Sequence, residues 1–227
     1  YRRLRLAEGK HDFFSNDYLG IARNGLIEAV LADEADGGGH PLSHGSTGSR
    51  LLAGNYPLIE ETENLIAAFH QSPSALIFNS GYNANLGLLS CVEARGAPLL
   101  SAKLSHASIR DGIRLSAAHT FSFVHNDPED LEKKLRKKKG NCFVVTESVF
   151  SMDGDEAPVK VLVELCERYG AHLIVDEAHA TGVAGRQGEG VMQREELHHR
   201  CFARVHTFGK ALGCHGAAIV CSEMLRN

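Results

Sequence analysis

The segment AHLIVDEAHATG, residues 171–182, decides how this chain folds. It begins with an apolar, β-branched run that stops at Asp176, and His179 follows three residues later. Successive apolar residues point to both faces of a strand, which is typical of a parallel sheet covered by helices on both sides. Ligands bind such sheets at the carboxyl ends of the strands. Asp176 and His179 are therefore expected to lie at a binding site.

Six further runs of the same kind are spread along the chain. They are SALIF (74–78), PLLSA (98–102), FSFV (121–124), CFVVTE (142–147), RVHTF (204–208) and AAIVC (217–221). With AHLIVDE (171–177) they predict seven strands, separated by segments of helical periodicity. This alternation predicts an α/β fold in which a mostly parallel seven-stranded sheet is covered by helices.

Two of the helices can be placed from sequence signals. One is predicted over residues 57–70, with an apolar stripe that is expected to face the core. The stripe comprises Leu58, Thr62, Leu65, Ile66 and Phe69. The other begins at Asp127, which can cap it, and runs to Gly140. Its lysine-rich end is expected to be solvated, and a basic docking site is the alternative interpretation.

The composition favours small-molecule chemistry. Hydrophobic residues make up 43% of the 227 and charged residues 23%, with a formal net charge of −4. This balance gives no general attraction to nucleic acid or to anionic membranes. The sequence has no transmembrane-length apolar run and no signal-peptide pattern, so we expect a cytoplasmic protein. Its six scattered cysteines do not indicate a disulfide framework.

A second polar segment is RVHTFGKALG, residues 204–213. Here a strand ends near Thr207, and Lys210 follows in a glycine-rich stretch. A lone lysine after a strand is usually a solvated surface residue. Together with Asp176 and His179, however, it provides an amine for a Schiff base, a carboxylate for a ring nitrogen and an imidazole for a phenolic oxygen. These groups describe a site for pyridoxal phosphate.

The spacing of the residues disfavours two other chemistries. The sequence DEAH also occurs in helicases, but neither Gly-Lys pair has the glycine five residues earlier that a phosphate loop requires, because Leu4 and Arg204 stand there. A structural zinc site would draw on His198, His199, Cys201, His206, Cys214 and His215. Their spacing fits no common zinc motif, so no metal site is predicted.

Eight ordered stretches, which span nearly the whole chain, make it resemble the α-oxoamine synthase family of pyridoxal phosphate enzymes. They are FFSNDYLG (13–20), GSTGSRLLAGNYPLIEETENLIAAF (45–69), FNSGYNANLG (78–87), LSHASIRDG (104–112), HNDPEDLE (125–132), VVTESVFSMDGDEAP (144–158), VDEAHATGVAG (175–185) and HTFGKALG (206–213). The resemblance implies the large domain of the aspartate-aminotransferase-like, fold type I enzymes.

The resemblance also implies roles for individual residues around the pyridoxal 5'-phosphate ring. Lys210 would bind the cofactor and later move the substrate α-proton, and Asp176 would pair with the ring nitrogen. His179 and Ser151 would contact the O3′ side of the ring, and His106 would stack on its face.

Further roles concern the phosphate and the substrate. The amides of Gly81 and Tyr82 would receive the phosphate, with the Thr207 hydroxyl beside them. Asn16 is implied to lie near the substrate. Arg2 is a candidate for a carboxylate or acyl-chain contact, and a solvated arm is its alternative interpretation.

The domain organisation expected from the resemblance is an N-terminal segment (1–40) and a large cofactor-binding domain (41–227). The family's smaller C-terminal domain is absent from this chain, which is therefore expected to be a fragment. The implied partners are amino acid and acyl thioester substrates and a second copy of the chain in a homodimer, with no nucleic acid and no membrane.

The reaction implied by the resemblance is a decarboxylating condensation of L-alanine with pimeloyl-CoA, or its carrier-protein equivalent, in biotin synthesis. Within the family, the alternative is 2-amino-3-ketobutyrate CoA ligase, which uses glycine and acetyl-CoA. An alternative of another class is an inactive fragment that binds only cofactor or a partner subunit.

Overall fold

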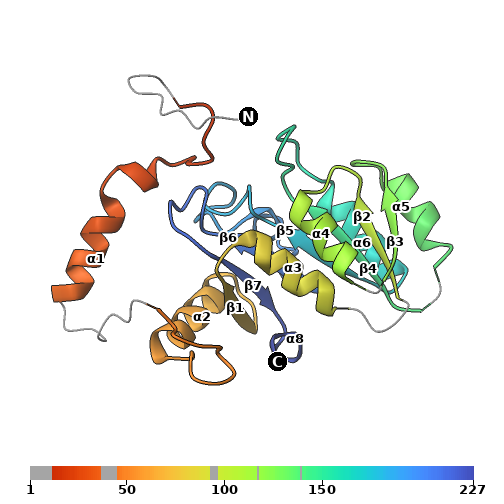
Figure 1. The fold of residues 1–227 in the computed structure, drawn as a ribbon. Coiled ribbons are helices and arrows are strands. Elements are labelled where there is room, and N and C mark those ends of the chain that lie inside the picture. The colour runs from red at the N-terminus through yellow and green to blue at the C-terminus, as the bar shows by residue number, and fades with distance from the viewer. Residues whose placement is uncertain (1–11, 37–44, 93–96, 117, 139) are drawn as a thin grey trace, which may run out of the picture.

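The protein is built around a seven-stranded sheet between layers of helices (Figure 1). The computed structural model describes residues 12–36, 45–92, 97–116, 118–138 and 140–227. The strands are β1 (Ser74–Phe78), β2 (Pro98–Ala102), β3 (His119–Phe123), β4 (Cys142–Glu147), β5 (Ala171–Asp176), β6 (Ala203–Thr207) and β7 (Ala217–Cys221). Their spatial order is β1-β7-β6-β5-β4-β2-β3, and only β7 runs antiparallel to its neighbours. The predicted α/β fold with a mostly parallel sheet is confirmed.

The helices are distributed over both faces of this sheet. They are α1 (Leu26–Asp36), α2 (Pro57–Phe69), α3 (Gly81–Cys91), α4 (Ala107–Leu115), α5 (Pro128–Leu135), α6 (Val159–Arg168), α7 (Val191–Arg194) and α8 (Glu223–Arg226), with 3-10 turns η1 (Ile21–Arg23) and η2 (His198–Arg200). α3 and α4 pack on one face, whereas α2, α5, α6 and α7 pack on the other. Among the described residues, no helix is long and apolar enough to span a membrane.

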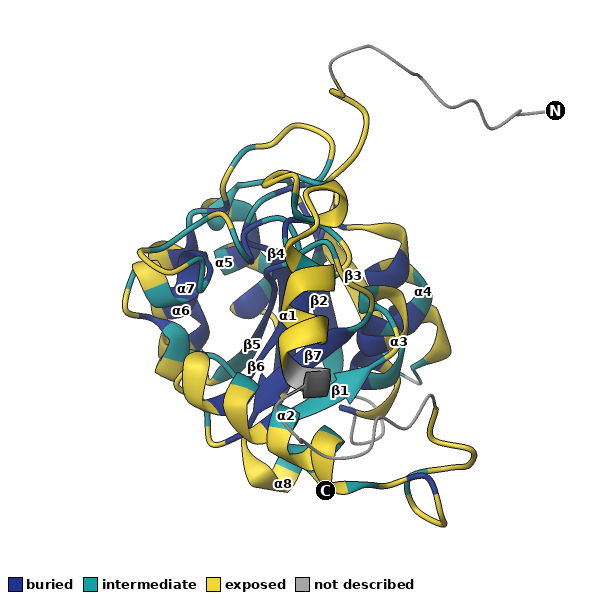
Figure 2. Ribbon diagram, turned by 90° about the vertical axis from the view of Figure 1, so that its left-hand side faces the viewer, coloured by how far each residue is buried: buried dark blue, intermediate teal, exposed yellow. Residues whose placement is uncertain are grey.

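The burial pattern follows from this layering. Side chains of the central strands are buried, and the outer faces of the helices are exposed (Figure 2). α1 and the short α8 differ from the other helices, because none of their described side chains is buried. On the face covered by α3 and α4, one continuous apolar cluster reaches from Leu99 to Cys221.

The opposite face has a buried polar seam, formed by His70, Arg204 and His206, between its two apolar clusters. The rings of His70 and His206 stack with centroids 3.7 Å apart, and Arg204 Nη2 donates to the His70 carbonyl at 2.6 Å. The Thr181 hydroxyl donates to the Glu177 carbonyl, so His206 Nδ1, 2.9 Å away, must donate to Thr181. Burial lowers the pKa of His70 to about 4 and holds the pKa of His206 well below its usual value.

The predicted apolar stripe of α2 faces the core only in part: Ile66 is half-buried and packs against the core, but for the leucines and Phe69 the prediction was wrong. Leu65 is 71% exposed, and Leu58 and Phe69 are also exposed, whereas Glu63 and Ala67 are buried. The small Ala67 lets the helix lie close to the sheet, next to Ala75 and Val220. The helix is thus rotated relative to the direction that apolar periodicity indicates.

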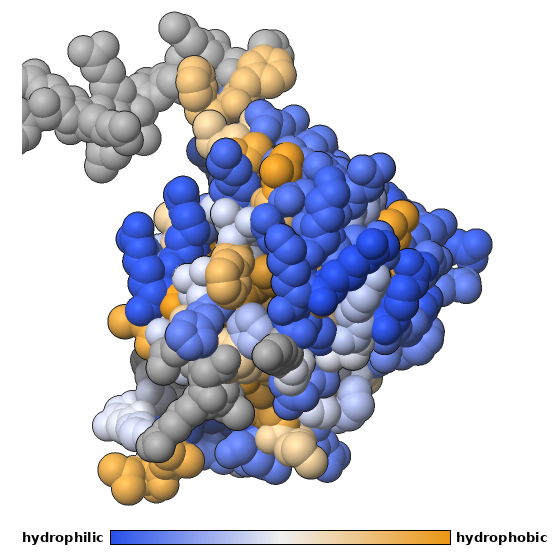
Figure 3. All heavy atoms as spheres, turned by 90° about the vertical axis from the view of Figure 1, so that its right-hand side faces the viewer, coloured by the Kyte–Doolittle hydropathy of each residue, from blue (hydrophilic) through white to orange (hydrophobic). Residues whose placement is uncertain are grey.

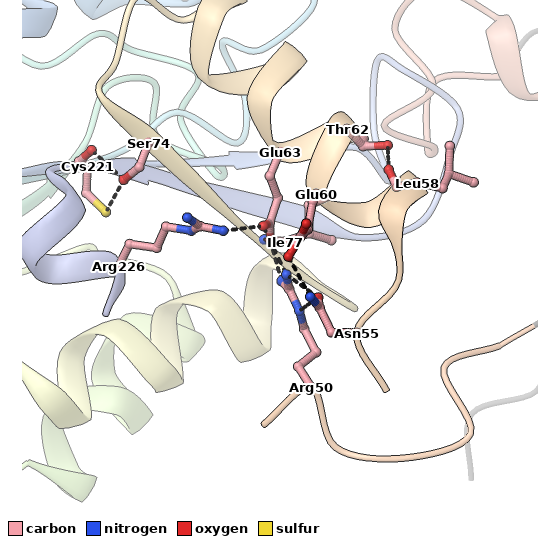
Figure 4. A network of polar contacts seen from close by, with 10 residues as sticks. All are labelled: Arg50, Asn55, Leu58, Glu60, Thr62, Glu63, Ser74, Ile77, Cys221 and Arg226. Atoms are coloured by element: carbon pink, nitrogen blue, oxygen red, sulfur yellow. Dashed lines mark hydrogen bonds and ion pairs between the residues drawn. The ribbon is translucent and has the colours of Figure 1, made fainter. Parts of the chain in front are cut away.

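Glu63 is buried because it is fully paired (Figure 4). Its carboxylate accepts hydrogen bonds from Arg50, from the Ile77 amide at 2.9 Å and from Arg226 at 3.1 Å. These contacts join α2 to β1, to the segment before α2 and to α8. A charge that hydropathy alone would place in solvent therefore lies at the centre of a network.

The helix predicted from Asp127 ends five residues earlier than expected, at Leu135 rather than Gly140. Its start agrees, since the Asp127 side chain accepts from the Glu129 and Asp130 amides at 3.0 Å. After Leu135 the chain continues in short turns, and Gly140 adopts a left-handed conformation with φ of 74°. The molecular face that includes α4 and α5 is largely hydrophilic (Figure 3).

Candidate active site

A cavity of about 120 Å³ lies where strands β4, β5 and β6 end and helices α3 and α4 begin. It is lined by Gly81, Tyr82, Asn85, His106, Ser108, Glu147, Asp176, Ala178, His179, Thr207 and Lys210. The lining residues come from segments far apart in the sequence, because parallel strands bring their carboxyl ends to one edge of the sheet. Except for Ser151, Asn16 and Arg2, every site residue predicted from the sequence is among them.

Lys210 lies at one side of this cavity, three residues after the end of β6. Its Nζ is 2.7 Å from His179 Nε2. Burial lowers the pKa of Lys210, while the negative charges of Asp176 and Glu147 oppose that shift. Burial and the adjacent lysine charge lower the pKa of His179 to about 4, so its ring is neutral at neutral pH and accepts a hydrogen bond from the amine. A lysine of lowered pKa offers more of its nucleophilic, uncharged form.

Tyr18 completes this arrangement, and sequence reasoning missed it. Its hydroxyl is 2.7 Å from His179 Nδ1. Because Nε2 accepts from Lys210, the neutral ring carries its proton on Nδ1 and donates to Tyr18, which in turn donates to Asn16 Oδ1 at 3.2 Å. The signal was present, since Tyr18 belongs to the same FFSNDYLG stretch as the predicted Asn16.

Two buried carboxyl groups form the base of the site. Asp176 is 5% exposed and accepts from the Ala178 amide at 2.9 Å and from Asn85 Nδ2 at 2.7 Å. Glu147 is its direct partner in the neighbouring strand and accepts from the His106 amide at 2.6 Å. Burial, followed by repulsion from Asp176, raises the pKa of Glu147 to about 7.

Glu147 was also missed in the sequence. It ends the run CFVVTE in the same way that Asp176 ends its own run, which is a signal that could have identified it.

The beginning of α3 provides an anion-binding arrangement. The Ser80 side chain caps this helix by accepting from the Asn83 amide at 3.1 Å, and the Gly81 amide follows at the first turn. A Cβ at Gly81 would lie 3.3 Å from both Cβ and Oγ1 of Thr207, so glycine lets the helix start and this hydroxyl come together. Amides at a helix start favour a negatively charged ligand. The Tyr82 side chain is directed elsewhere, to Asp111.

Three predicted residues lie outside the cavity lining. Ser151 is half-buried and its amide donates to Glu147. Asn16 is exposed and reaches the site only through Tyr18. Arg2 lies outside the described residues.

The residues considered for zinc do not form a metal centre in the described part of the chain. His206 belongs to the buried polar seam, whereas Cys214 is exposed. In that part of the chain, the group with side chains close enough to share an ion is His125, Asp153 and Asp155, which includes none of the zinc candidates.

Comparison with known proteins decides the family. A family model of aminotransferases of class I and II matches residues 8–227, almost the entire chain. The chain belongs to this family.

Relatives within this aminotransferase family agree with the fold and with the predicted resemblance. The chain is 44% identical over 233 residues to 8-amino-7-oxononanoate synthase of Emericella nidulans, covering 95% of this chain and 56% of that protein. A solved serine palmitoyltransferase from S. paucimobilis, with a bound PLP–myriocin aldimine, has a TM-score of 0.84 at 33% identity. The match covers 93% of this chain and 54% of the palmitoyltransferase chain. The chain thus spans a little over half the length of these relatives.

A second solved relative supports the same placement. The crystal structure of 8-amino-7-oxononanoate synthase from Francisella tularensis has a TM-score of 0.76 at 29% identity. The match covers 94% of this chain and 59% of the synthase chain. The resemblance to α-oxoamine synthases, inferred from eight sequence stretches, is confirmed.

Proposed function

We propose that this protein binds pyridoxal 5'-phosphate and forms the cofactor-binding part of an α-oxoamine synthase. The reaction is the decarboxylating condensation of L-alanine with pimeloyl-CoA, or pimeloyl carrier protein, to 8-amino-7-oxononanoate in biotin synthesis. The observation that carries the proposal is the cavity in which the half-buried Lys210 amine lies with the Asp176 carboxylate and the α3 amides. Similarity to the Emericella nidulans synthase supports the choice of substrates.

The residues of the cavity fit the chemical groups of pyridoxal phosphate. Lys210 is the only lysine lining the described cavity and provides the amine for the aldehyde. The α3 amides and Thr207, drawn together by Gly81, suit the phosphate. Asp176 suits a protonated ring nitrogen, and His106 at the start of α4 suits the ring face. When bound, the cofactor supplies an electron sink for charge that develops on a substrate carbon.

The protein's own residues then perform three tasks. Asp176, buried and held by two N–H donors, keeps a negative charge beside the ring nitrogen. His179, neutral at physiological pH, accepts a hydrogen bond from Lys210 and orients its Nζ. Lys210, whose Nζ lies in the cavity beside His179, would take the proton from the α-carbon of a bound substrate at Nζ. Burial of these groups limits the access of water to the reacting atoms.

The remaining roles complete the proposal. Ser151 and His179 contact the O3′ side of the ring, Tyr82 contributes its amide, and Asn16 and Arg2 contact substrate. The protein acts as a cytoplasmic homodimer. Within the family, 2-amino-3-ketobutyrate CoA ligase is the alternative activity, and a fragment that binds cofactor without turnover is the alternative of another class.

Borohydride reduction of the protein after incubation with pyridoxal phosphate tests this proposal. Peptide mapping is expected to place the pyridoxyl label on Lys210, because that amine lines the cavity, is half-buried and has a lowered pKa. Lys103 and Lys160 serve as internal controls. A label on either of them instead of Lys210 would contradict the assignment. Incubation with alanine or glycine and a panel of acyl thioesters then separates the two synthase activities from a fragment without turnover.

A further inference from the structure

A hydrogen-bonded bridge connects the Asp176 carboxylate to the His106 imidazole. Asn85 Nδ2 lies 2.7 Å from Asp176 Oδ2 and 3.0 Å from Ser108 Oγ. Ser108 Oγ is in turn 2.8 Å from His106 Nδ1. Asn85 is 2% exposed and Ser108 is 1% exposed, so water does not compete for these bonds. Neither residue has a role in the function proposed above.

The donors and acceptors of this bridge can be ordered without ambiguity. The carboxylate of Asp176 requires a donor, so the amide nitrogen of Asn85, and not its oxygen, must face it. The second N–H of Asn85 points to Ser108 Oγ, which leaves the hydroxyl proton of Ser108 free to donate to His106. The Ser108 amide also donates to His106 Nδ1, at 3.2 Å. Two donors converge on Nδ1, so the neutral ring carries its proton on Nε2.

The fold holds Asn85 in this place at a cost in stability. Asn85 Oδ1 is buried and has no hydrogen-bond partner among the described residues. An unpaired buried polar atom is unfavourable, and an apolar residue would avoid it. The close approach of α3 and α4 also depends on Gly112, because a Cβ there would lie 2.8 Å from the Asn85 carbonyl oxygen. An apolar side chain would pack better here, but it could not join Asp176 to Ser108.

We propose that Asn85 and Ser108 are positioning residues. Together they orient the Asp176 carboxylate, which would face the ring nitrogen, and the His106 imidazole, which would face the ring plane. Asn85 orients the Asp176 carboxylate and the Ser108 hydroxyl through its two N–H groups. The Ser108 hydroxyl in turn donates to His106 Nδ1 and so fixes the tautomer of that ring. The role toward the cofactor rests on the proposed function. The bridge itself exists in the protein alone, so the two can be tested separately.

The first test uses the protein without cofactor and follows the imidazole nitrogens of His106 by ¹⁵N NMR. The wild type is expected to show an unprotonated Nδ1 and a protonated Nε2. In Asn85→Ala and Ser108→Ala the Nδ1 signal is expected to shift, and Ser108→Thr, which keeps the hydroxyl, is expected to restore it. Asn83→Ala is the matched control, because Asn83 lies exposed on the same helix and its side chain donates to Asn79, which is not part of the bridge. An unchanged Nδ1 signal in Asn85→Ala would overturn the bridge.

The second test compares pyridoxal phosphate with its analogue that has C–H in place of the ring nitrogen. If Asn85 acts through Asp176, Asn85→Ala should weaken binding of pyridoxal phosphate about tenfold, as loss of a charge-assisted hydrogen bond would. It should leave binding of the analogue within about twofold, because the analogue has no ring nitrogen for Asp176 to hold. A merely structural effect would weaken both equally, and that result would overturn the positioning role.

The two tests also distinguish this inference from the proposed function. If wild-type protein bound neither compound, the proposed function would fail, and the NMR result would still decide whether the bridge exists. If wild-type protein bound pyridoxal phosphate and Asn85→Ala bound it equally well, the positioning role alone would fail.

Discussion

Replacing the two stacked histidines of the polar seam should remove much of the protein's sensitivity to acid. His70 and His206 are uncharged in the folded protein because burial lowers the pKa of each, to about 4 for His70. His206 Nε2 also has no hydrogen-bond partner among the described residues that could accept a proton from it. The variant to compare with wild type is His70→Leu with His206→Val, which fills both places with apolar side chains.

The sign of the effect follows from proton binding in the two states. Below a pH of about 6.5 an unfolded histidine binds a proton that the folded protein does not. The free energy of unfolding therefore decreases as the pH is lowered, until the pH reaches the pKa of the histidine in the folded protein. When the pH is lowered from 7 to 5, one histidine with a pKa of about 4 in the folded protein lowers the free energy of unfolding by about 2 kcal/mol. The pKa of His206 is also lowered by burial, so His206 acts in the same direction and the pair should account for more than the roughly 2 kcal/mol of His70 alone.

Urea unfolding of the cofactor-free protein at pH 7 and pH 5, followed by circular dichroism, measures this difference. Burial raises the pKa of Glu147 and of Glu177, and both groups stabilise the folded state as the pH falls. The pH dependence of wild type alone is therefore a sum of opposing terms. Subtracting the result for the double variant cancels the shared groups. The double variant should lose at least about 2 kcal/mol less than wild type between the two pH values, because His70 alone accounts for that amount.

His119→Val is the matched control, since His119 is an exposed strand residue. It should show the same pH dependence as wild type. If the double variant and wild type lost the same free energy of unfolding between pH 7 and pH 5, the idea that the seam is held uncharged would be refuted.

Three other substitutions are expected to have measurable effects. Glu63→Leu should lower the free energy of unfolding by roughly 3–5 kcal/mol in urea, because it leaves Arg50 and Arg226 without their buried partner; a change under 1 kcal/mol would show that the network adds little. Gly112→Ala should destabilise by about 1–3 kcal/mol, since its Cβ would meet the Asn85 carbonyl, and unaltered thermal unfolding would contradict the close packing of α3 against α4. Asp127→Ala should cost about 1 kcal/mol by removing the cap of α5, whereas Asp153→Ala, at an exposed turn, serves as its comparison in the same assay.

Most of the fold could be predicted because its signals are local. Each of the seven strands is a short apolar or β-branched run; four have the predicted bounds and the other three differ from them by at most two residues. The orientation of α2 could not be predicted in this way. Glu63 is buried only because Arg50, Ile77 and Arg226 surround it, and these partners are brought together by the complete fold.

The candidate site shows the same division. Asp176, His179 and Lys210 could be predicted because each lies at the end of a strand or within three residues after it, and parallel strands end at one edge. Asn85 could not, since its place depends on how closely α3 approaches α4 and on the side-chain geometry of Ser108. Glu147 ends a predicted strand as Asp176 does, so its place at the site was open to prediction, but its protonation behaviour was not. Its raised pKa of about 7 comes from burial and from Asp176 in the next strand.

The position of β7 between β1 and β6 has a consequence for the order in which the protein forms during synthesis. β1 pairs only with β7 in the sheet, and Ser74 bonds to Cys221, 147 residues later. At translation rates of roughly 5–20 residues per second, β1 waits on the order of ten seconds or more for its partner to leave the ribosome. During that interval both edges of SALIF are unpaired, and such edges promote contacts between nascent chains. Chaperone binding should therefore concentrate on β1, the first strand made, and on α2, which packs against it and is also completed only when β7 arrives.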